Sequence, residues 1–251
     1  MKTIAFLGAK KIGYRCLQYL LENKTVLNAK VIALASNEQT VLQNNEHCLL
    51  QLANEYQITV LPNLKDLPNC DFIVSVQYHK ILKQRHIDKA KVLAVNLHMA
   101  PLPEYRGCNQ FSFAIVDGAK VFGTTLHQLE AGIDDGAILF ERRFPIEPNW
   151  FVSDLYEHTV KESFVLFRNH IAELIAGRYT PVPQQNLLAE RGTSYHYRHE
   201  INNLKVINLD WSKEKIERHI RATYFPPYEP PYAYVNQKKM YFLHKWETKN
   251  S

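Results

Sequence analysis

One stretch near the middle of the chain holds an amide, an imidazole and a carboxylate that could act together on a carbonyl carbon. An apolar run at residues 92–96 predicts a buried strand that ends on Asn96, and His98 lies two residues further on. Because side chains two apart on a strand point the same way, we expect Asn96 and His98 to emerge together. The turn at residues 132–136 can bring a carboxylate back to them. Such a group suits acid–base chemistry at a carbonyl.

The elements that must position these side chains follow a regular alternation. Short apolar runs predict strands at residues 3–7, 29–35, 59–61, 71–76 and 92–96. Helical patterns follow the first strand and occupy residues 37–56 and 83–90. This alternation predicts an α/β fold with a Rossmann-like, mostly parallel sheet flanked by helices. Ligands bind such sheets beyond the carboxyl ends of the strands, where residues 8–13, 77–82 and 96–98 should lie.

The second half of the chain continues the sheet and then changes character. We expect a helix at residues 110–116, paired strands at 121–129 and 137–144, and a helix at 154–176 that Ser153 caps and Gly177 ends. Beyond it the sequence is rich in proline and aromatic residues. We therefore divide the chain into a catalytic domain at residues 1–178 and a small C-terminal extension at 179–251.

The extension should end in a β-hairpin. A helix is expected at residues 213–222, and strands at residues 233–235 and 239–243 form the hairpin. An isolated hairpin is only marginally stable in water, so this one should pack on the body or on another subunit. We expect a homodimer built partly on it.

The bulk composition is that of an ordinary globular protein. Of 251 residues, 46% are hydrophobic and 22% charged, and the formal charge is +5. This mild excess suits an anionic small molecule, although ordinary surface lysines explain it equally well. The four cysteines form no CxxC pair, so we expect free thiols in a reducing compartment. The sequence suggests neither a membrane span nor a signal peptide, which predicts a cytoplasmic protein without a membrane partner.

The glycine turn at residues 8–13 matches neither the dinucleotide-binding nor the P-loop pattern. A turn into a helix N-terminus can still bind a phosphate, helped here by Lys10 or Lys11. A tight turn with solvated lysines is an equally good interpretation.

Three motifs in this chain resemble the formyltransferases that use N10-formyltetrahydrofolate. They are Asn96-Leu97-His98, the proline-rich loop that ends on Arg106-Gly107, and Asp134-Asp135-Gly136, where Asp134 stands at the family's separation from His98. The family includes methionyl-tRNA formyltransferase, glycinamide ribonucleotide transformylase and the sugar N-formyltransferases. Residues 75–82, 96–110 and 143–156 are most similar to the sugar enzymes that act on dTDP-linked amino-6-deoxy sugars. The resemblance covers residues 1–177, and residues 221–232 more weakly.

The resemblance implies roles for the three central side chains. Asn96 would donate a hydrogen bond to the formyl oxygen as negative charge develops there. His98 would take the proton of the attacking amine, and Asp134 would orient His98, raise its basicity or pass a proton through water. The chemistry needs no metal, and we predict no metal site. Four other histidines are interpreted as structural or solvated, namely His127, His158, His170 and His219.

The resemblance also implies binding residues. The folate-binding segment comprises Gln77, Tyr78, His79 and Ile81. Candidate contacts to the sugar nucleotide are Lys10 at the pyrophosphate, Tyr224 stacked on thymine, and Tyr105, Arg106, Asn109 and Gln110. Arg106 could instead pin its own loop through hydrogen bonds to carbonyls, and Tyr224 could be a core or hinge aromatic.

The function that follows is N-formylation of dTDP-4-amino-4,6-dideoxyglucose, with N10-formyltetrahydrofolate as co-substrate, for O-antigen or other surface polysaccharide. A dTDP-3-amino-3,6-dideoxy sugar or a GDP-linked amino sugar is the alternative within the class. A methionyl-tRNA formyltransferase should carry a basic C-terminal domain, whereas this tail is short and aromatic, and we expect no nucleic-acid partner. A non-catalytic folate-binding protein should lack one of Asn96, His98 and Asp134.

Overall fold

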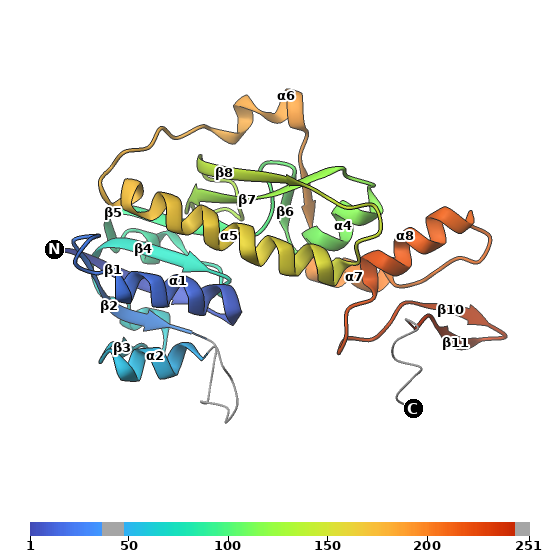
Figure 1. Cartoon of the computed structure of the whole chain (residues 1–251), viewed down its shortest axis with the longest axis horizontal. Helices are drawn as coiled ribbons and strands as arrows, with labels where there is room; N and C mark the ends of the chain where they lie inside the picture. The colour runs from blue at the N-terminus through green and yellow to red at the C-terminus, as the bar shows by residue number, and fades with distance from the viewer. Residues whose placement is uncertain (37–47, 244–251) are drawn as a thin grey trace.

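A computed structural model describes residues 1–36 and 48–243 of the chain and contains a seven-stranded sheet with helices on both faces (Figure 1). The strand order is β3-β2-β1-β4-β5-β7-β8. Five strands run parallel: β3 (Thr59–Val60), β2 (Ala29–Ala35), β1 (Lys2–Gly8), β4 (Cys70–Val76) and β5 (Ala90–His98). The last two, β7 (Val121–Gln128) and β8 (Ile138–Pro145), add as antiparallel neighbours. The predicted mostly parallel α/β sheet is confirmed.

Side chains alternate between two cores because successive residues of a strand face opposite sides of the sheet. In β1, Ile4 and Phe6 pack on the face covered by α1 (Lys10–Glu22), α2 (Leu49–Glu55) and α5 (Val152–Ile175). Ala5 and Leu7 pack on the opposite face, beside Leu82. Figure 1 shows α1 and α5 lying together across the first face, and a ring contact between Tyr19 and Phe164 joins them.

Two expected helices are shorter than predicted, and one begins differently. In the described part of residues 37–56 the helix is α2, and residues 37–47 lie outside the described residues. The helix expected at 83–90 is only α3 (Gln84–Ile87), because Ala90 already belongs to β5. Ser153 does not cap α5: the helix starts at Val152, and the Asp154 carboxylate accepts the Phe151 N–H at 2.8 Å.

The carboxyl ends of three parallel strands lie next to one another, as expected. Gly8 at the end of β1 is paired with Val76 at the end of β4, and Val76 is paired with Leu97 in β5. The Ala9 N–H also donates to the Val76 carbonyl at 3.1 Å. The glycine turn, residues 77–82 and residues 96–98 therefore share one edge of the sheet.

After α5, the chain runs back along the outer edge of β8 toward α6 (Leu188–Arg191) and then turns to β9 (Ser194–His196) (Figure 1). A short two-stranded sheet attaches this returning segment to the loop after β5, because β9 pairs in parallel with β6 (Tyr105–Gly107). The remaining elements are η1 (Leu64–Asp66), α4 (Gln110–Val116), η2 (Gln184–Asn186), η3 (Arg198–Glu200), α7 (Ile201–Leu204) and α8 (Lys213–Thr223). The helices expected at 110–116 and 213–222 are confirmed.

The predicted C-terminal hairpin is present as β10 (Tyr232–Val235) and β11 (Lys238–Tyr241) (Figure 1). Asn236 and Gln237 connect the strands, both with positive φ (49° and 63°), as tight hairpin turns require. Tyr232 anchors the hairpin to the body, because its N–H donates to the Lys205 carbonyl at 2.9 Å. In the two described ranges, none of the helices is both long and apolar enough to cross a membrane.

Candidate active site

The structure brings Asn96, His98 and Asp134 into one group at the carboxyl end of β5. Asn96 and His98 face the same side of the sheet as Ala94, whereas Val95 and Leu97 pack in the core under α1 and α5. The Nδ1 atom of His98 lies 3.6 Å from Oδ1 of Asp134. The side chains of His98 and Asp134 are only 6% and 14% exposed, which strengthens any charge interaction between them.

A second histidine lies in the same group, which the sequence did not predict, and the interpretation of His127 as a structural or solvated residue is not tested by its position alone. His127 lies opposite Asn96 in the antiparallel pairing of β5 with β7, and its Nε2 is 3.1 Å from Asn96 Nδ2. The same Nε2 is 3.6 Å from Asp134 Oδ1. Only the register between two strands brings His127 here, and residue spacing in the sequence carries no signal for it.

Backbone carbonyls fix the tautomers of both histidines. His98 Nε2 lies 2.8 Å from the Tyr105 carbonyl oxygen, and His127 Nδ1 lies 2.7 Å from the Gln128 carbonyl oxygen. A carbonyl only accepts, so these two ring nitrogens carry the hydrogens. The lone pairs of the neutral rings are then on His98 Nδ1 and His127 Nε2, the two atoms that face Asp134. The Asn96 amide donates to His127 Nε2.

The Asp134 carboxylate is held in its place by the backbone of the loop after β5. Asp134 has a left-handed φ of 52°, and its Oδ2 accepts the Gly107 N–H at 3.0 Å. Burial acts to raise the pKa of Asp134, but its interactions with His98 and His127, which are attractive when a ring takes a second proton, and the Gly107 hydrogen bond outweigh it. The net result is a pKa well below the ordinary value, so this group is a carboxylate at neutral pH.

Arg106 contacts the turn that carries Asp134. Its Nε and one terminal nitrogen donate to the Ile133 carbonyl at 3.1 and 2.7 Å, and the same terminal nitrogen lies 3.6 Å from Asp135 Oδ2. Of the two roles considered for Arg106, these contacts match the one in which its side chain holds a loop through hydrogen bonds to carbonyls. Tyr105 contributes its carbonyl to His98, while its hydroxyl donates to Asp117 at 3.4 Å. Burial and the Asp117 charge raise the pKa of Tyr105 far above its usual value.

Three other predicted substrate contacts lie within packed structure. Asn109, at the start of α4, donates its amide to the Tyr197 and Arg198 carbonyls at 2.9 and 3.1 Å. Gln110 is 8% exposed, and Tyr224 is 3% exposed with its ring 6.2 Å from that of Phe151.

The predicted folate segment follows β4 directly. Gln77 adopts a positive φ of 55° and accepts a hydrogen bond from Lys10 Nζ at 3.3 Å. The rings of Tyr78 and His79 contact edge to face, with centroids 4.8 Å apart. Ile81 is 64% exposed at the surface.

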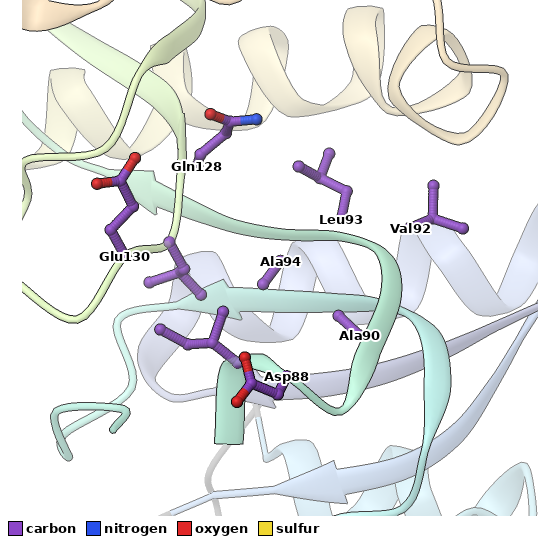
Figure 2. Close-up of a pocket in the computed structure, with 9 residues that line it drawn as sticks. Asp88, Ala90, Val92, Leu93, Ala94, Gln128 and Glu130 are labelled. Carbon is purple, nitrogen blue, oxygen red and sulfur yellow. The ribbon is translucent and has the colours of Figure 1, made fainter. Parts of the chain in front are cut away.

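A hollow of about 290 Å³ lies beside the first half of β5 and is lined from Ile87 to Ala94 and by residues 128–130. Ala94 stands two residues before Asn96, Leu129 stands two after His127, and the Leu129 N–H donates to the Ala94 carbonyl at 2.8 Å. Ala94 lies between Asp88 on one side and Gln128 and Glu130 on the other (Figure 2). Ala94 also shares a core cluster with Leu82 and Tyr78, and the hollow itself is lined by Ile87 and Asp88 at the end of α3.

Lys10 places a positive charge at the same edge of the sheet, at the start of α1. Partial desolvation lowers the pKa of Lys10, and the charge of Arg198 lowers it further. Among the described residues neither cation has a carboxylate within 4.0 Å. Residues 1–36 and 48–243 contain no group of three or more His, Cys, Asp or Glu that could hold a metal ion.

Comparison with known proteins places this arrangement in context. The sequence pattern of the formyl transferase family matches residues 22–168, which include Asn96, His98 and Asp134. A GDP-perosamine N-formyltransferase of Brucella melitensis is 28% identical over 216 residues, which are 84% of this chain and 81% of that protein. A methionyl-tRNA formyltransferase of Clostridium novyi is 25% identical over 248 residues, which are 94% of this chain and 78% of that protein.

The fold agrees with a solved sugar enzyme. The crystal structure of an N-formyltransferase from Helicobacter canadensis, in complex with folinic acid and dTDP-3-aminofucose, superposes with a TM-score of 0.78. The two sequences are 27% identical, and the alignment covers 95% of this chain and 86% of that one.

Proposed function

Because this chain belongs to the formyl transferase family, we propose that it transfers the formyl group of N10-formyltetrahydrofolate to the amine of a nucleotide-linked amino sugar. Its enzyme class, formyltransferase, follows from the family. The observation that carries the proposal is the convergence of Asn96, His98 and Asp134 at the carboxyl end of β5. The sugar acceptor is supported by similarity to the Brucella and Helicobacter enzymes.

Asn96 is suited to stabilise the oxyanion. One hydrogen of its amide is donated to His127, and the other is donated to none of the described residues. The second hydrogen is therefore available to the formyl oxygen, where negative charge develops when the amine attacks. Removing one such donor typically costs about 3 kcal/mol, on the order of a hundredfold or more in rate.

His98 is suited to remove the proton that the amine must lose. The amine nitrogen forms a bond to the formyl carbon, and the carbonyl electrons move onto oxygen. His98 Nδ1 takes the amine proton, and the Asp134 carboxylate beside it balances the charge of the imidazolium. The carbonyl then re-forms, the bond from carbon to the folate nitrogen breaks, and that nitrogen takes up a proton. In this geometry the Tyr105 carbonyl orients the His98 ring. The role of Asp134 is then to stabilise the positive charge of the protonated ring.

We place the pteridine of the folate in the hollow beside Ala94 and Leu129. Its apolar lining can cover the ring, and the acceptor groups of Asp88, Gln128 and Glu130 can receive the ring N–H donors. The segment from Gln77 to Ile81 would close this site from the neighbouring strand.

We place the pyrophosphate of the sugar nucleotide between Lys10 and Arg198. Lys10 stands at the start of α1, where the N-terminus of the helix favours an anion, and the charge of Arg198 acts on the same lysine. Arg106 and Asn109 would act indirectly, by holding the loop and the extension. Contact of Gln110 or Tyr224 with the nucleotide would require both buried side chains to rearrange on binding.

The preferred substrate within this proposal is dTDP-4-amino-4,6-dideoxyglucose, in O-antigen or other surface polysaccharide synthesis in the cytoplasm. A dTDP-3-amino sugar is the nearest alternative, because the Helicobacter neighbour was crystallised with dTDP-3-aminofucose. A GDP-linked amino sugar is the other, because of the Brucella relative.

A substrate panel tests this proposal. Purified protein, N10-formyltetrahydrofolate and each of the dTDP- and GDP-linked 3-amino and 4-amino sugars are incubated, and products are identified by mass spectrometry. We expect one dTDP-linked sugar to be N-formylated fastest. Formylation of methionyl-tRNA with no sugar product would contradict the proposal.

A pair of lysine variants tests the nucleotide site in the same assay. Lys10→Met should raise the KM for the sugar nucleotide about tenfold and leave the KM for folate unchanged. Lys11→Met is the matched control, because Lys11 instead pairs with Glu157 on the surface, at 3.3 Å. Equal effects of the two variants would remove Lys10 from the pyrophosphate site.

A further inference from the structure

Gln184, far from the catalytic motifs in the sequence, contacts the turn that carries Asp134. It stands at the start of η2, after the long helix α5, and is 5% exposed. Its Nε2 donates to the Asp134 carbonyl and to the Gly136 carbonyl, both at 2.8 Å. The Gln184 amide thus links the carbonyls of Asp134 and Gly136, which lie on either side of Asp135.

The orientation of this amide is fixed by its partners. Both contacts are carbonyl oxygens, which only accept, so the nitrogen of Gln184 must face them. The Oε1 atom accepts a hydrogen bond from none of the residues in the two described ranges. A buried acceptor without a partner is unfavourable, so the useful part of this side chain is its pair of donors.

The turn needs such support because of its backbone conformation. Asp134 is a residue other than glycine with a left-handed φ of 52°, which is intrinsically unfavourable. That conformation aims its carboxylate at the Gly107 N–H and at His98. The approach of Gln184 is set by a short antiparallel bridge, in which Ile138 and Val182 exchange backbone hydrogen bonds of 2.9 and 2.8 Å.

We propose that Gln184 is a positioning residue, which fixes the backbone at 134–136 so that the Asp134 carboxylate stays opposite His98. The catalytic consequence of this inference rests on the proposed function, because it assumes that Asp134 takes part in formyl transfer. A segment beyond α5 thereby completes the site that the motifs at residues 96–136 begin.

Two substitutions separate hydrogen bonding from packing. Gln184→Met keeps the shape and removes both donors. It should lower kcat about tenfold or more, as expected for a small displacement of a catalytic group, with both KM values nearly unchanged. Gln184→Glu should lose activity as a carboxylate, which cannot donate, and regain part of it as pH falls and one O–H donor returns. The matched control is Gln185→Met, at the exposed neighbouring position, which should behave as wild type.

A wild-type kcat in a folded Gln184→Met variant would overturn the proposal. So would a Gln184→Glu variant whose pH profile runs parallel to that of the wild type, and this second test holds even if Gln184→Met does not fold.

Hydrogen exchange followed by mass spectrometry gives a readout that needs no substrate. In the Gln184 variants we expect faster exchange at residues 132–136 and unchanged exchange in β1. If no acceptor sugar is found, the proposed function fails while this result still decides the structural part of the inference. Unchanged exchange at 132–136 would overturn that part.

Discussion

At the residue scale, the chemistry depends on which nitrogen of each histidine is committed to the backbone. His98 commits Nε2 to Tyr105 and His127 commits Nδ1 to Gln128, so each ring presents its other nitrogen to Asp134. Asp134 is therefore flanked by two groups that become positive on protonation. The carboxylate can stabilise a proton that either ring receives, which is what a base at a transferring amine needs.

This charge arrangement predicts how stability depends on pH. The pKa of Asp134 is lowered on folding, so the folded protein releases this proton more readily than the unfolded chain. The resulting stability is fully present above the ordinary aspartate pKa and is lost as pH falls through the lowered value. The melting temperature of the wild type should therefore begin to approach that of Asp134→Asn only below about pH 4 and continue to do so as the pH is reduced toward about 2.

The control for this comparison is Asp66→Asn, since Asp66 lies in η1, away from the catalytic group. A difference between wild type and Asp134→Asn that stays constant over the same pH range would contradict the assigned charge interaction.

The residues that were predictable are those with a motif of their own. Asn96, His98 and Asp134 could be found because their types and separations match a family. His127 could not, because its position depends on the register of β7 against β5. Gln184 could not either, because its two hydrogen bonds go to backbone carbonyls that any sequence would supply.

At the scale of elements, the site forms where parallel strands end and short connections bind the loops together. The ends of β1, β4 and β5 were predicted to meet because alternating strands and helices generate a parallel sheet. The β6–β9 pair was not predicted. Each strand has only three residues, and their pairing holds the loop after β5 against the extension. Strands this short have no alternation of apolar residues from which they could be predicted.

The side chain of Arg106 joins β6 to the turn at 132–136, so its removal should loosen that turn. Arg106→Met removes both donors to the Ile133 carbonyl, so we expect a loss of about 1–2 kcal/mol in the free energy of unfolding. Turnover should fall about tenfold or more, since the turn carries Asp134. Chemical denaturation and steady-state kinetics measure the two effects.

Arg142→Met is the matched control, because Arg142 pairs with Glu162 at the surface and its side chain is 45% exposed. Exposed ion pairs contribute little, so stability should change by less than about 1 kcal/mol. Equal losses in both variants would show that Arg106 does not hold the turn.

At the scale of the whole molecule, the segment after α5 is more than an appendage. It supplies β9, the bridge at Val182 and the amide of Gln184 to the framework of the site. The sequence predicted its helix at 213–222 and its hairpin, whose periodicity and turn residues are local signals. Its return along the edge of β8 was not predictable, because irregular connections carry little pattern. The division of the chain near residue 178 stays a prediction.

The hairpin predicts a homodimer. Tyr234 and Tyr241 on one face of the hairpin are 57% and 47% exposed, and Val235 and Met240 on the other face are 41% and 57% exposed, which leaves apolar side chains uncovered on a marginal element. Sedimentation at micromolar concentration should give a dimer for the wild type. Met240→Asp should shift the protein toward the monomer.

Val26→Asp is the matched control for the dimer, since Val26 is 85% exposed in the turn after α1, far from the hairpin in the sequence. A monomeric wild type, or dissociation caused equally by both variants, would contradict a hairpin interface.

In the proposed reaction, Asn96, His98 and Asp134 surround one carbon as it passes from a folate nitrogen to a sugar nitrogen. The most direct test follows a carbon-13 label in the formyl group of N10-formyltetrahydrofolate by NMR, with the best acceptor of the substrate panel. The wild type should move the label onto the sugar amine, while Asn96→Ala, His98→Ala and Asp134→Ala remain folded and transfer it about a hundredfold more slowly or less. A label that stays on folate with wild-type protein, or transfer at the wild-type rate by any of the three variants, would contradict the account.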